Sequence, residues 1–506
     1  MKRTYKLLSL VLAALLLLPL LASCSANKSG NDLAPEADEN CENPLPNYDK
    51  SEIRGEIEEN GFAENPFIAT GEQNISTFSA DVDTASYTYF RKLVNQGYTL
   101  QQLQNNAKSF RTEEFINYFK YDVATPREND LFGVTADFVT CPWNSSNLLM
   151  RLTLQAETAA PTEGNNLVFL IDVSGSMSSN DKLPLLKKAF SNLVGALDEN
   201  DTVSIVTYSG AEKVVLDGCK GNMDERIMKA INELEAGGST NGEAGINMAY
   251  QIAEKHFIEG GNNRIIMASD GDLNVGISSQ EELTRLIEQK RDAGVYLSVL
   301  GFGTGNYRDG KMEALADNGN GVYYYIDGES EAERVLGTDL LSTLYTVAND
   351  VKMQITFDPA FVASYRLIGY ENRILNTEDF EDDKKDAGEV GAEHQVTVCY
   401  ELCLAEGARE ATAPWMKLAV RYKSPGESMS NLNEYDLGKE LLRESASEDI
   451  KFLTCVIETV MILHNSKYKG DLTLAGVLED LNALDLTKYP ERKEFKALIQ
   501  KLIDTK

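Results

Sequence analysis

Hydrophobic residues between positions 165 and 330 fall into short continuous runs that are separated by amphipathic segments. Runs that are apolar at every position are typical of strands that a parallel sheet buries on both faces. The intervening segments carry apolar residues every three or four positions, as Leu183, Leu186 and Phe190 do, which predicts helices. The runs lie at residues 167–171, 203–208, 265–268, 295–300 and 322–326. This alternation predicts a doubly wound, mainly parallel α/β domain, Rossmann-like in layout, at residues 161–349.

Outside this domain the hydrophobic period changes to two. Alternation of apolar and polar residues predicts half-buried antiparallel strands. Such segments are residues 351–357, 396–402 and 416–422, and two further strand-like runs are residues 134–140 and 148–154. We therefore expect a β-sandwich, built from residues 131–160 and 350–440, into which the α/β domain is inserted.

The remaining segments have helical periodicity. Apolar residues recur at helical spacing from Thr77 to about Tyr121, which predicts a helical N-terminal domain over residues 71–130. A second helical region is expected over residues 441–506, opened by a possible capping box from Ser445 to Glu448.

The first residues predict export and lipid attachment. Lys2, Arg3 and Lys6 precede an apolar run over residues 7–21, which is too short to be a convincing membrane-spanning helix. Small residues and then Cys24 follow, in a sequence that resembles a bacterial lipoprotein cleavage box. We expect a signal peptide at residues 1–23, lipidation at Cys24 and a disordered tether at residues 24–70, with the protein anchored in the cell envelope on the extracytoplasmic side. The alternative is an ordinary signal peptide with a chance cysteine.

Net charge and composition disfavour several classes of binding partner and metal site. The 506-residue chain carries a formal net charge of −31, which disfavours nucleic acid and anionic lipid surfaces. The seven cysteines include no C-x-x-C pair, and with three histidines a zinc site is improbable. Cys399 and Cys403 lie four residues apart on one predicted strand, which is too far for a mutual disulfide.

Three polar loops follow or precede the predicted parallel strands in positions that meet at one edge of the sheet. They contain Asp172, Ser174 and Ser176, then Thr240, and then Asp270. Ligands bind at this edge in open α/β sheets, and two acids with three hydroxyls suit a hard cation in octahedral coordination. Because hydroxyls replace several carboxylates, such a cation would keep an open position for an anionic oxygen from outside. The alternative is that Asp172, Ser174 and Ser176 only begin a helix.

The same residues resemble the von Willebrand factor type A domain over about residues 165–348. That family carries a metal-ion-dependent adhesion site of Asp-x-Ser-x-Ser with a distant Thr and a distant Asp. The resemblance implies that Ser174, Ser176 and Thr240 bind the metal through hydroxyls, and that Asp172 and Asp270 act directly or through water. It also implies a partner carboxylate that completes the coordination shell. The flanks resemble bacterial membrane lipoproteins with such domains, through residues 81–87, 141–144 and 365–372.

These observations predict a membrane-anchored binding protein rather than an enzyme. The expected cofactor is a divalent cation, Mg²⁺ first and Mn²⁺ or Ca²⁺ as alternatives, and the expected partner is a protein that presents a carboxylate. One alternative is an envelope assembly or stress factor that organises a membrane complex. The other is a metal-dependent hydrolase, for which Asp272 is the nearby candidate base.

Overall fold

The computed structural model describes residues 63–505, apart from 128–129, 159–162, 241, 272–279, 304–308, 340–341 and 343. The predicted signal peptide, Cys24 and most of the predicted tether lie outside these residues. Within them, no helix combines the length and the apolar character that crossing a membrane requires.

The α/β domain contains one six-stranded sheet in the order β10-β9-β8-β5-β6-β7. Its strands are β5 (Asn165–Asp172), β6 (Thr202–Tyr208), β7 (Glu212–Lys220), β8 (Asn262–Ser269), β9 (Tyr296–Phe302) and β10 (Tyr323–Ile326). All neighbouring strands are parallel except β6 and β7. The predicted doubly wound, mainly parallel sheet is therefore confirmed.

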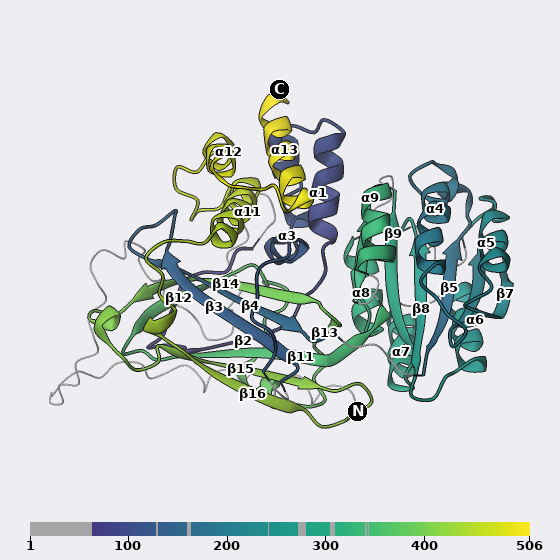
Figure 1. Ribbon diagram of the computed structural model, residues 1–506, viewed down its shortest axis with the longest axis horizontal. Coiled ribbons are helices and arrows are strands. Elements are labelled where there is room, and N and C mark those ends of the chain that lie inside the picture. Colours follow the sequence, from purple (N-terminus) through teal and green to yellow (C-terminus); the bar gives the residue numbers. More distant parts are fainter. Residues whose placement is uncertain are drawn as a thin grey trace, which may run out of the picture. The chain divides into compact units, whose positions relative to one another are not determined.

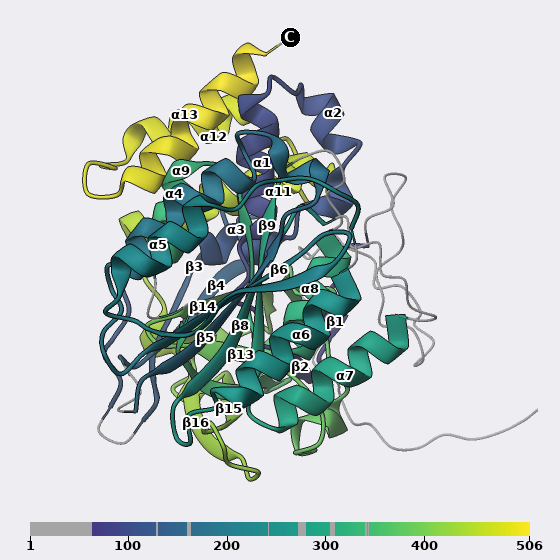
Figure 2. The same cartoon turned by 90° about the vertical axis from the view of Figure 1, so that its right-hand side faces the viewer.

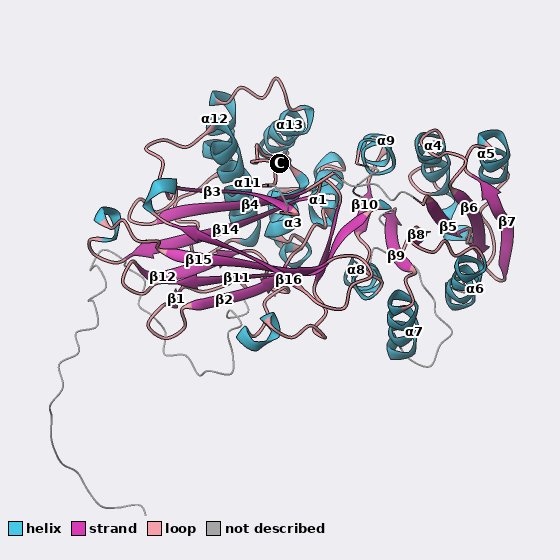
Figure 3. Cartoon of the chain, turned by 60° about the horizontal axis from the view of Figure 1, so that its bottom comes forward, coloured by secondary structure: helices cyan, strands magenta, loops and turns pink. Residues whose placement is uncertain are grey.

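Helices cover both faces of this sheet. Figure 3 shows α4, α5 and α9 on one face and α6, α7 and α8 on the other. They are α4 (Leu183–Val194), α5 (Asp224–Asn232), α6 (Gly242–Lys255), α7 (Gln280–Asp292), α8 (Asp309–Asn318) and α9 (Glu329–Glu333). The pattern of hydrophobic residues did not predict β7, because this edge strand is largely exposed and its apolar run covers only residues 214–216.

Two antiparallel sheets form the β-sandwich. One has the order β1-β12-β14-β4-β3, and the other has the order β13-β11-β15-β16 with β2 paired to β11. Their strands are β1 (Ile68–Ala69), β2 (Ile75–Ser79), β3 (Phe132–Thr140), β4 (Leu148–Ala156), β11 (Thr346–Phe357), β12 (Val362–Ile368), β13 (Gly388–Gly391), β14 (Gln395–Leu404), β15 (Met416–Lys423) and β16 (Asn431–Leu437). Figure 1 shows β3, β4, β12 and β14 in one layer and β2, β11, β15 and β16 in the other. Aromatic pairs fill the space between them, such as Phe138 with Trp415 and Phe357 with Tyr365, whose ring centroids lie 5.2 and 4.2 Å apart.

The first of these sheets is buried on both of its faces. We expected residues 396–402 to form a half-buried strand, but the polar-facing positions Thr397, Cys399 and Glu401 of β14 are at most 1% exposed. The reason is that helices pack on the face turned away from the sandwich core. The alternation of apolar and polar residues therefore predicted which residues of β14 share a face. It did not predict that helices, rather than solvent, cover the outer face.

The covering helices come from both ends of the described chain. They are α1 (Ala85–Asn95), α2 (Leu100–Gln104), α3 (Thr112–Tyr118), α11 (Glu448–His464), α12 (Leu474–Ala483) and α13 (Pro490–Asp504). Figure 2 shows α1, in purple, beside α13, in yellow, and Lys501 of α13 donates to the Asn95 carbonyl at 3.2 Å. Phe90, Phe115, Phe452 and Phe495 belong to one hydrophobic cluster. The two helical regions that we expected separately thus share one core.

The N-terminal boundaries differ from our expectation. Residues 63–70, the end of the predicted tether, belong to the folded part, because Asn65 is buried and donates to the Gly369 carbonyl at 2.7 Å. Residues 75–79, placed in the helical domain that we expected from residue 71, form β2 and pair with β11. The polar residues of β2 hid this strand, since they alternate with few apolar ones.

Two further details refine the sequence reading. Helix α11 begins at Glu448 and is capped by Ser447, whose hydroxyl accepts a hydrogen bond from the Ile450 amide at 3.3 Å, rather than by the expected Ser445. Cys403 is disulfide-bonded, whereas Cys399 on the same strand is a buried free thiol.

Candidate metal centre

The five predicted metal ligands, which we call the edge site, are Asp172, Ser174, Ser176, Thr240 and Asp270. Four of them lie in loops at the carboxyl ends of β5 and β8, which are neighbours at the centre of the sheet. Asp172 is the last residue of β5, and Asp270 follows directly after β8. Strand order reverses at β5, since β6 lies on one side and β8 on the other, and open α/β sheets bind ligands at such a point.

The loop that precedes Thr240 is held against the loop that follows β5. The Gly237 amide donates to the Val173 carbonyl at 2.7 Å, and the Gly175 amide donates to the Gly238 carbonyl at 3.1 Å. Gly238 has φ of +85°, a conformation that favours glycine and lets this loop turn close to its neighbour. Thr240 lies two residues further on and is partly exposed. Among the described residues, no hydrogen bond joins Thr240 to the other four members of the edge site.

Hydrogen bonds bring the β5 loop into a compact turn. The Ser174 amide donates to Asp172 Oδ1 at 2.8 Å, and the hydroxyls of Ser174 and Ser176 lie 3.0 Å apart. Ser174 stands at the start of the short 3₁₀ helix η2 (Gly175–Ser178), but its side chain makes no capping hydrogen bond. Helix capping therefore does not explain the Ser174 hydroxyl.

The two carboxylates of the edge site are almost fully buried. Asp172 is 0% exposed and Asp270 is 3% exposed. Burial raises the pKa of Asp172 to about 6, although the hydrogen bonds from Ser174 oppose the shift. Ser269 adds a hydroxyl that donates to Asp172 Oδ2 at 3.4 Å. Buried carboxylates at a loop edge are costly unless a cation or further donors compensate them.

A lysine is part of this arrangement. The Lys182 ammonium donates to Asp270 Oδ2 at 2.7 Å and to the Ser176 carbonyl at 3.0 Å. It therefore contacts both loops and supplies positive charge beside Asp270. No sequence motif marks Lys182, because it comes six residues after Ser176 and only the turn at η2 brings it back to the site. Ser269 could have been predicted as a residue of the site, because it is the last residue of β8 and directly precedes Asp270.

The donor set suits a hard divalent cation. It consists of carboxylate and hydroxyl oxygens, with no thiolate or imidazole among the five residues, and this is the chemistry that Mg²⁺ and Ca²⁺ prefer. Asp172, Ser174, Ser176 and Asp270 would hold such an ion. Asp272, the candidate base of a hydrolase, lies outside the described residues.

Three family matches cover most of the chain. Residues 166–337 match the von Willebrand factor type A domain, residues 56–151 match a family described as "von Willebrand factor", and residues 342–504 match the family described as "Uncharacterized protein YfbK, C-terminal". The YfbK protein of Escherichia coli (strain K12) is 38% identical over 434 residues, which are 80% of this chain and 74% of that protein. The chain belongs to the YfbK family of von Willebrand factor type A domain proteins.

The YfbK family match extends past the α/β domain. It covers strands β11 to β16 and helices α11 to α13, so this part of the sandwich and the C-terminal helices lie in the matched region. More distant relatives match a smaller share of the chain. Human inter-alpha-trypsin inhibitor heavy chain H3 is 28% identical over 187 residues, which are 35% of this chain and 21% of that protein. Among solved structures, the "von Willebrand factor type A from Catenulispora acidiphila" has a TM-score of 0.40 and 14% identity, and covers 72% of this chain and 83% of that chain.

Proposed function

We propose that this YfbK family member is an exported, lipid-anchored binding protein rather than an enzyme. Its edge site would hold a divalent cation, Mg²⁺ in the first place, and the cation would bind a carboxylate of a protein partner. Cys24 would carry the lipid on the extracytoplasmic side of a membrane.

The observation that carries this proposal is the meeting of the Asp172 turn and Asp270 around a cationic group. The Lys182 ammonium at 2.7 Å from Asp270 indicates that positive charge is favourable at this place. Two serine hydroxyls 3.0 Å apart face the same turn and add neutral donors instead of further charge. When bound, a divalent cation here would supply a Lewis-acid position for one more anionic oxygen.

Charge explains why a cation would be needed between the two partners. A chain with a formal net charge of −31 repels an acidic partner at long range. A cation that both proteins contact offsets this repulsion locally and makes binding depend on the metal. The same charge disfavours nucleic acid as a partner.

Export is supported by the disulfide at Cys403. Such bonds persist in oxidising compartments and are rare in the cytosol. This agrees with the leader and the cleavage box that end at Cys24, which predict transfer across the membrane.

The proposal can be tested by capture from envelope extracts. Immobilised wild-type protein should retain a defined partner in Mg²⁺, and a chelator should release it. The variant Ser174→Ala/Asp270→Ala should retain at least tenfold less of that partner, while the matched surface variant Ser179→Ala/Asp224→Ala should behave as wild type. Retention that is equal with and without chelator, or unchanged in the Ser174→Ala/Asp270→Ala variant, would contradict the proposal. The identity of the captured partner distinguishes the two binding roles. A protein of another cell would indicate adhesion, and a protein of the same envelope would indicate the organisation of an envelope complex.

A further inference from the structure

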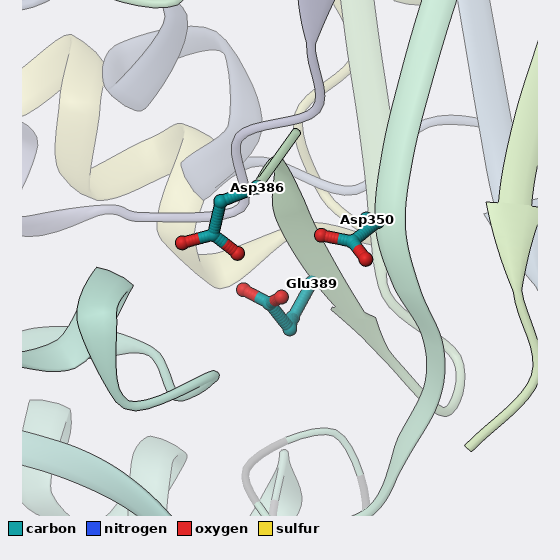
Figure 4. A group of neighbouring side chains, drawn as sticks. All are labelled: Asp350, Asp386 and Glu389. Atoms are coloured by element: carbon teal, nitrogen blue, oxygen red, sulfur yellow. The ribbon is translucent and has the colours of Figure 1, made fainter. Parts of the chain in front are cut away.

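A second group of carboxylates lies away from the edge site, where the sandwich meets helix α7. We call it the junction cluster, and it consists of Asp350, Asp386 and Glu389. Asp350 is on β11, Glu389 is on the neighbouring strand β13, and Asp386 comes just before β13. Each residue has a carboxylate oxygen within 4.8 Å of those of the other two. Figure 4 shows the three carboxyl groups facing one another.

Basic residues partly compensate two of these acids. Lys423 Nζ lies 2.6 Å from Asp350 Oδ2, and Arg291 of helix α7 lies 2.8 Å from Asp386 Oδ2. The Asp350 carboxylate also accepts a hydrogen bond from the Ala387 amide at 3.1 Å. Each of the two aspartates therefore uses one oxygen for a basic side chain.

Glu389 is different. It is 6% exposed, it forms no ion pair with any described residue, and its Oε1 atom is buried without a hydrogen-bond partner. Burial and then the neighbouring Asp386 and Asp350 carboxylates raise the pKa of Glu389 well above its usual range. The Glu389 carboxyl group faces two other carboxylates and has a buried oxygen that is bonded to nothing, so it requires either a retained proton or a cation.

The geometry favours a cation that accepts several carboxylates. Oxygens that bind one Ca²⁺ at about 2.3–2.6 Å lie within about 5 Å of each other, and its coordination is flexible. Mg²⁺ demands a regular octahedron, keeps several waters and is usually held by only one or two carboxylates. The three residues differ in solvent exposure: the Asp386 side chain is 46% exposed, whereas Glu389 is buried. An ion can therefore enter from solvent at Asp386.

We propose that Asp350, Asp386 and Glu389 form a second cation site, which takes Ca²⁺ and joins β11 and β13 beside helix α7. The Glu389 carboxylate is its inner ligand, and the two aspartates contribute the oxygens that face it. This site does not depend on the edge site or on a partner, so its role is structural. It lies where the chain passes from the α/β domain into the sandwich, because β11 is the first strand after that domain.

The experiment is a Ca²⁺ titration of the full chain by calorimetry, in the Ser174→Ala/Asp270→Ala background that silences the edge site. One Ca²⁺ should bind with a Kd of about 1 mM or tighter, as in extracellular calcium modules. Glu389→Gln, which keeps the shape of the side chain, should weaken binding at least tenfold. Glu381→Gln, which changes an exposed acid in the same segment, should leave the affinity unchanged.

A fold control separates binding from structure. Metal-free Glu389→Gln should unfold at the same temperature as its parent or higher, because it removes a buried acid, and it should lose the rise in Tm that Ca²⁺ produces. Asp386→Asn, at the exposed rim, provides a second variant with the same expected loss. Absence of saturable Ca²⁺ binding, binding that Glu389→Gln leaves intact, or tighter binding of Mg²⁺ than of Ca²⁺ would overturn the assignment.

Discussion

The edge site and the surroundings of Arg91 both gather acidic side chains around a basic one, yet they differ in how the charges are paired. Arg91 of helix α1 bonds Asp327 at 2.5 Å, Glu331 at 2.8 Å and Glu494 at 3.0 Å, and it also donates to the Tyr118 hydroxyl. The three acids come from the α/β domain and from helix α13, and Tyr118 comes from helix α3. The guanidinium is thus fully used by groups that the fold itself supplies.

At the edge site, Asp172 forms no ion pair with any described residue. The Lys182 ammonium bonds Asp270, while Asp172 accepts hydrogen bonds from the Ser174 amide and the Ser269 hydroxyl, and the serine hydroxyls of Ser174 and Ser176 lie 3.0 Å apart. The difference suggests two uses of charge in one molecule. Complete pairing at Arg91 fixes segments that are distant in the sequence, while the edge site keeps oxygens that a cation from solvent can use.

The largest effect is expected from Arg91→Met. Removing a buried cation leaves Asp327 and Glu331 without their shared partner, which should lower the free energy of unfolding by about 3–5 kcal/mol. Lys229→Met is the matched control, since the Lys229–Glu233 pair is exposed and should contribute less than about 1 kcal/mol. Urea unfolding measures both. Mg²⁺ should not restore the stability that Arg91→Met loses. Restoration by Mg²⁺ would contradict the proposed difference between the surroundings of Arg91 and the edge site.

Glu458 is a buried carboxyl that forms no ion pair with a described residue, so the effect of its charge can be measured through the pH dependence of stability. Burial and the neighbouring Asp480 raise the pKa of Glu458, on helix α11, from 4.5 to about 7. The folded state therefore keeps a proton that the unfolded state releases, and this group makes stability fall as the pH rises from about 4.5 to about 7. Glu458→Gln should remove that loss and stabilise the protein by up to about 3 kcal/mol at pH 8, with little change at pH 4. Equal effects at both pH values in urea unfolding would contradict this.

Lys182→Met should have a smaller effect that metal reverses. The Lys182 side chain is 12% exposed and its ammonium bonds a buried carboxylate, so its loss should destabilise the metal-free protein by about 1–3 kcal/mol. Added Mg²⁺ should restore stability, because it replaces the missing positive charge beside Asp270. Thermal unfolding with and without Mg²⁺ measures this, and Lys188→Met, at an exposed pair, is the control. A deficit in Lys182→Met that Mg²⁺ does not reduce would argue that Lys182 is only a structural residue.

The parallel sheet could be predicted from sequence because strands buried on both faces leave continuous apolar runs. Strand β2 could not, since its Ser76, Thr77 and Ser79 carry no such run and it is defined by pairing with β11, far away in the chain. Burial of Cys399 was equally hidden, because it depends on helices from both ends of the described chain that pack over β14. A local sequence pattern predicts local structure, whereas the pairing of β2 and the burial of β14 depend on contacts between segments that are distant in the sequence.

The candidate site likewise contains residues that could be predicted from sequence and residues that could not. Asp172, Ser174, Ser176 and Asp270 follow strands, and the rule for open sheets brings such positions together. Lys182 and the junction cluster are not marked by any motif. The junction cluster in particular arises from a register shift between β11 and β13 near Asp350, which only the folded strands reveal.

The most direct test of the central claim is calorimetric titration of Mg²⁺ into the wild-type chain and into Ser174→Ala/Asp270→Ala, both carrying Glu389→Gln to silence the junction cluster. Saturable binding of one ion to the first protein, weakened at least 100-fold in the second, is the predicted result. Binding of equal strength in both, or no binding in either even with a carboxylate ligand such as acetate present, would contradict the edge site as a metal centre.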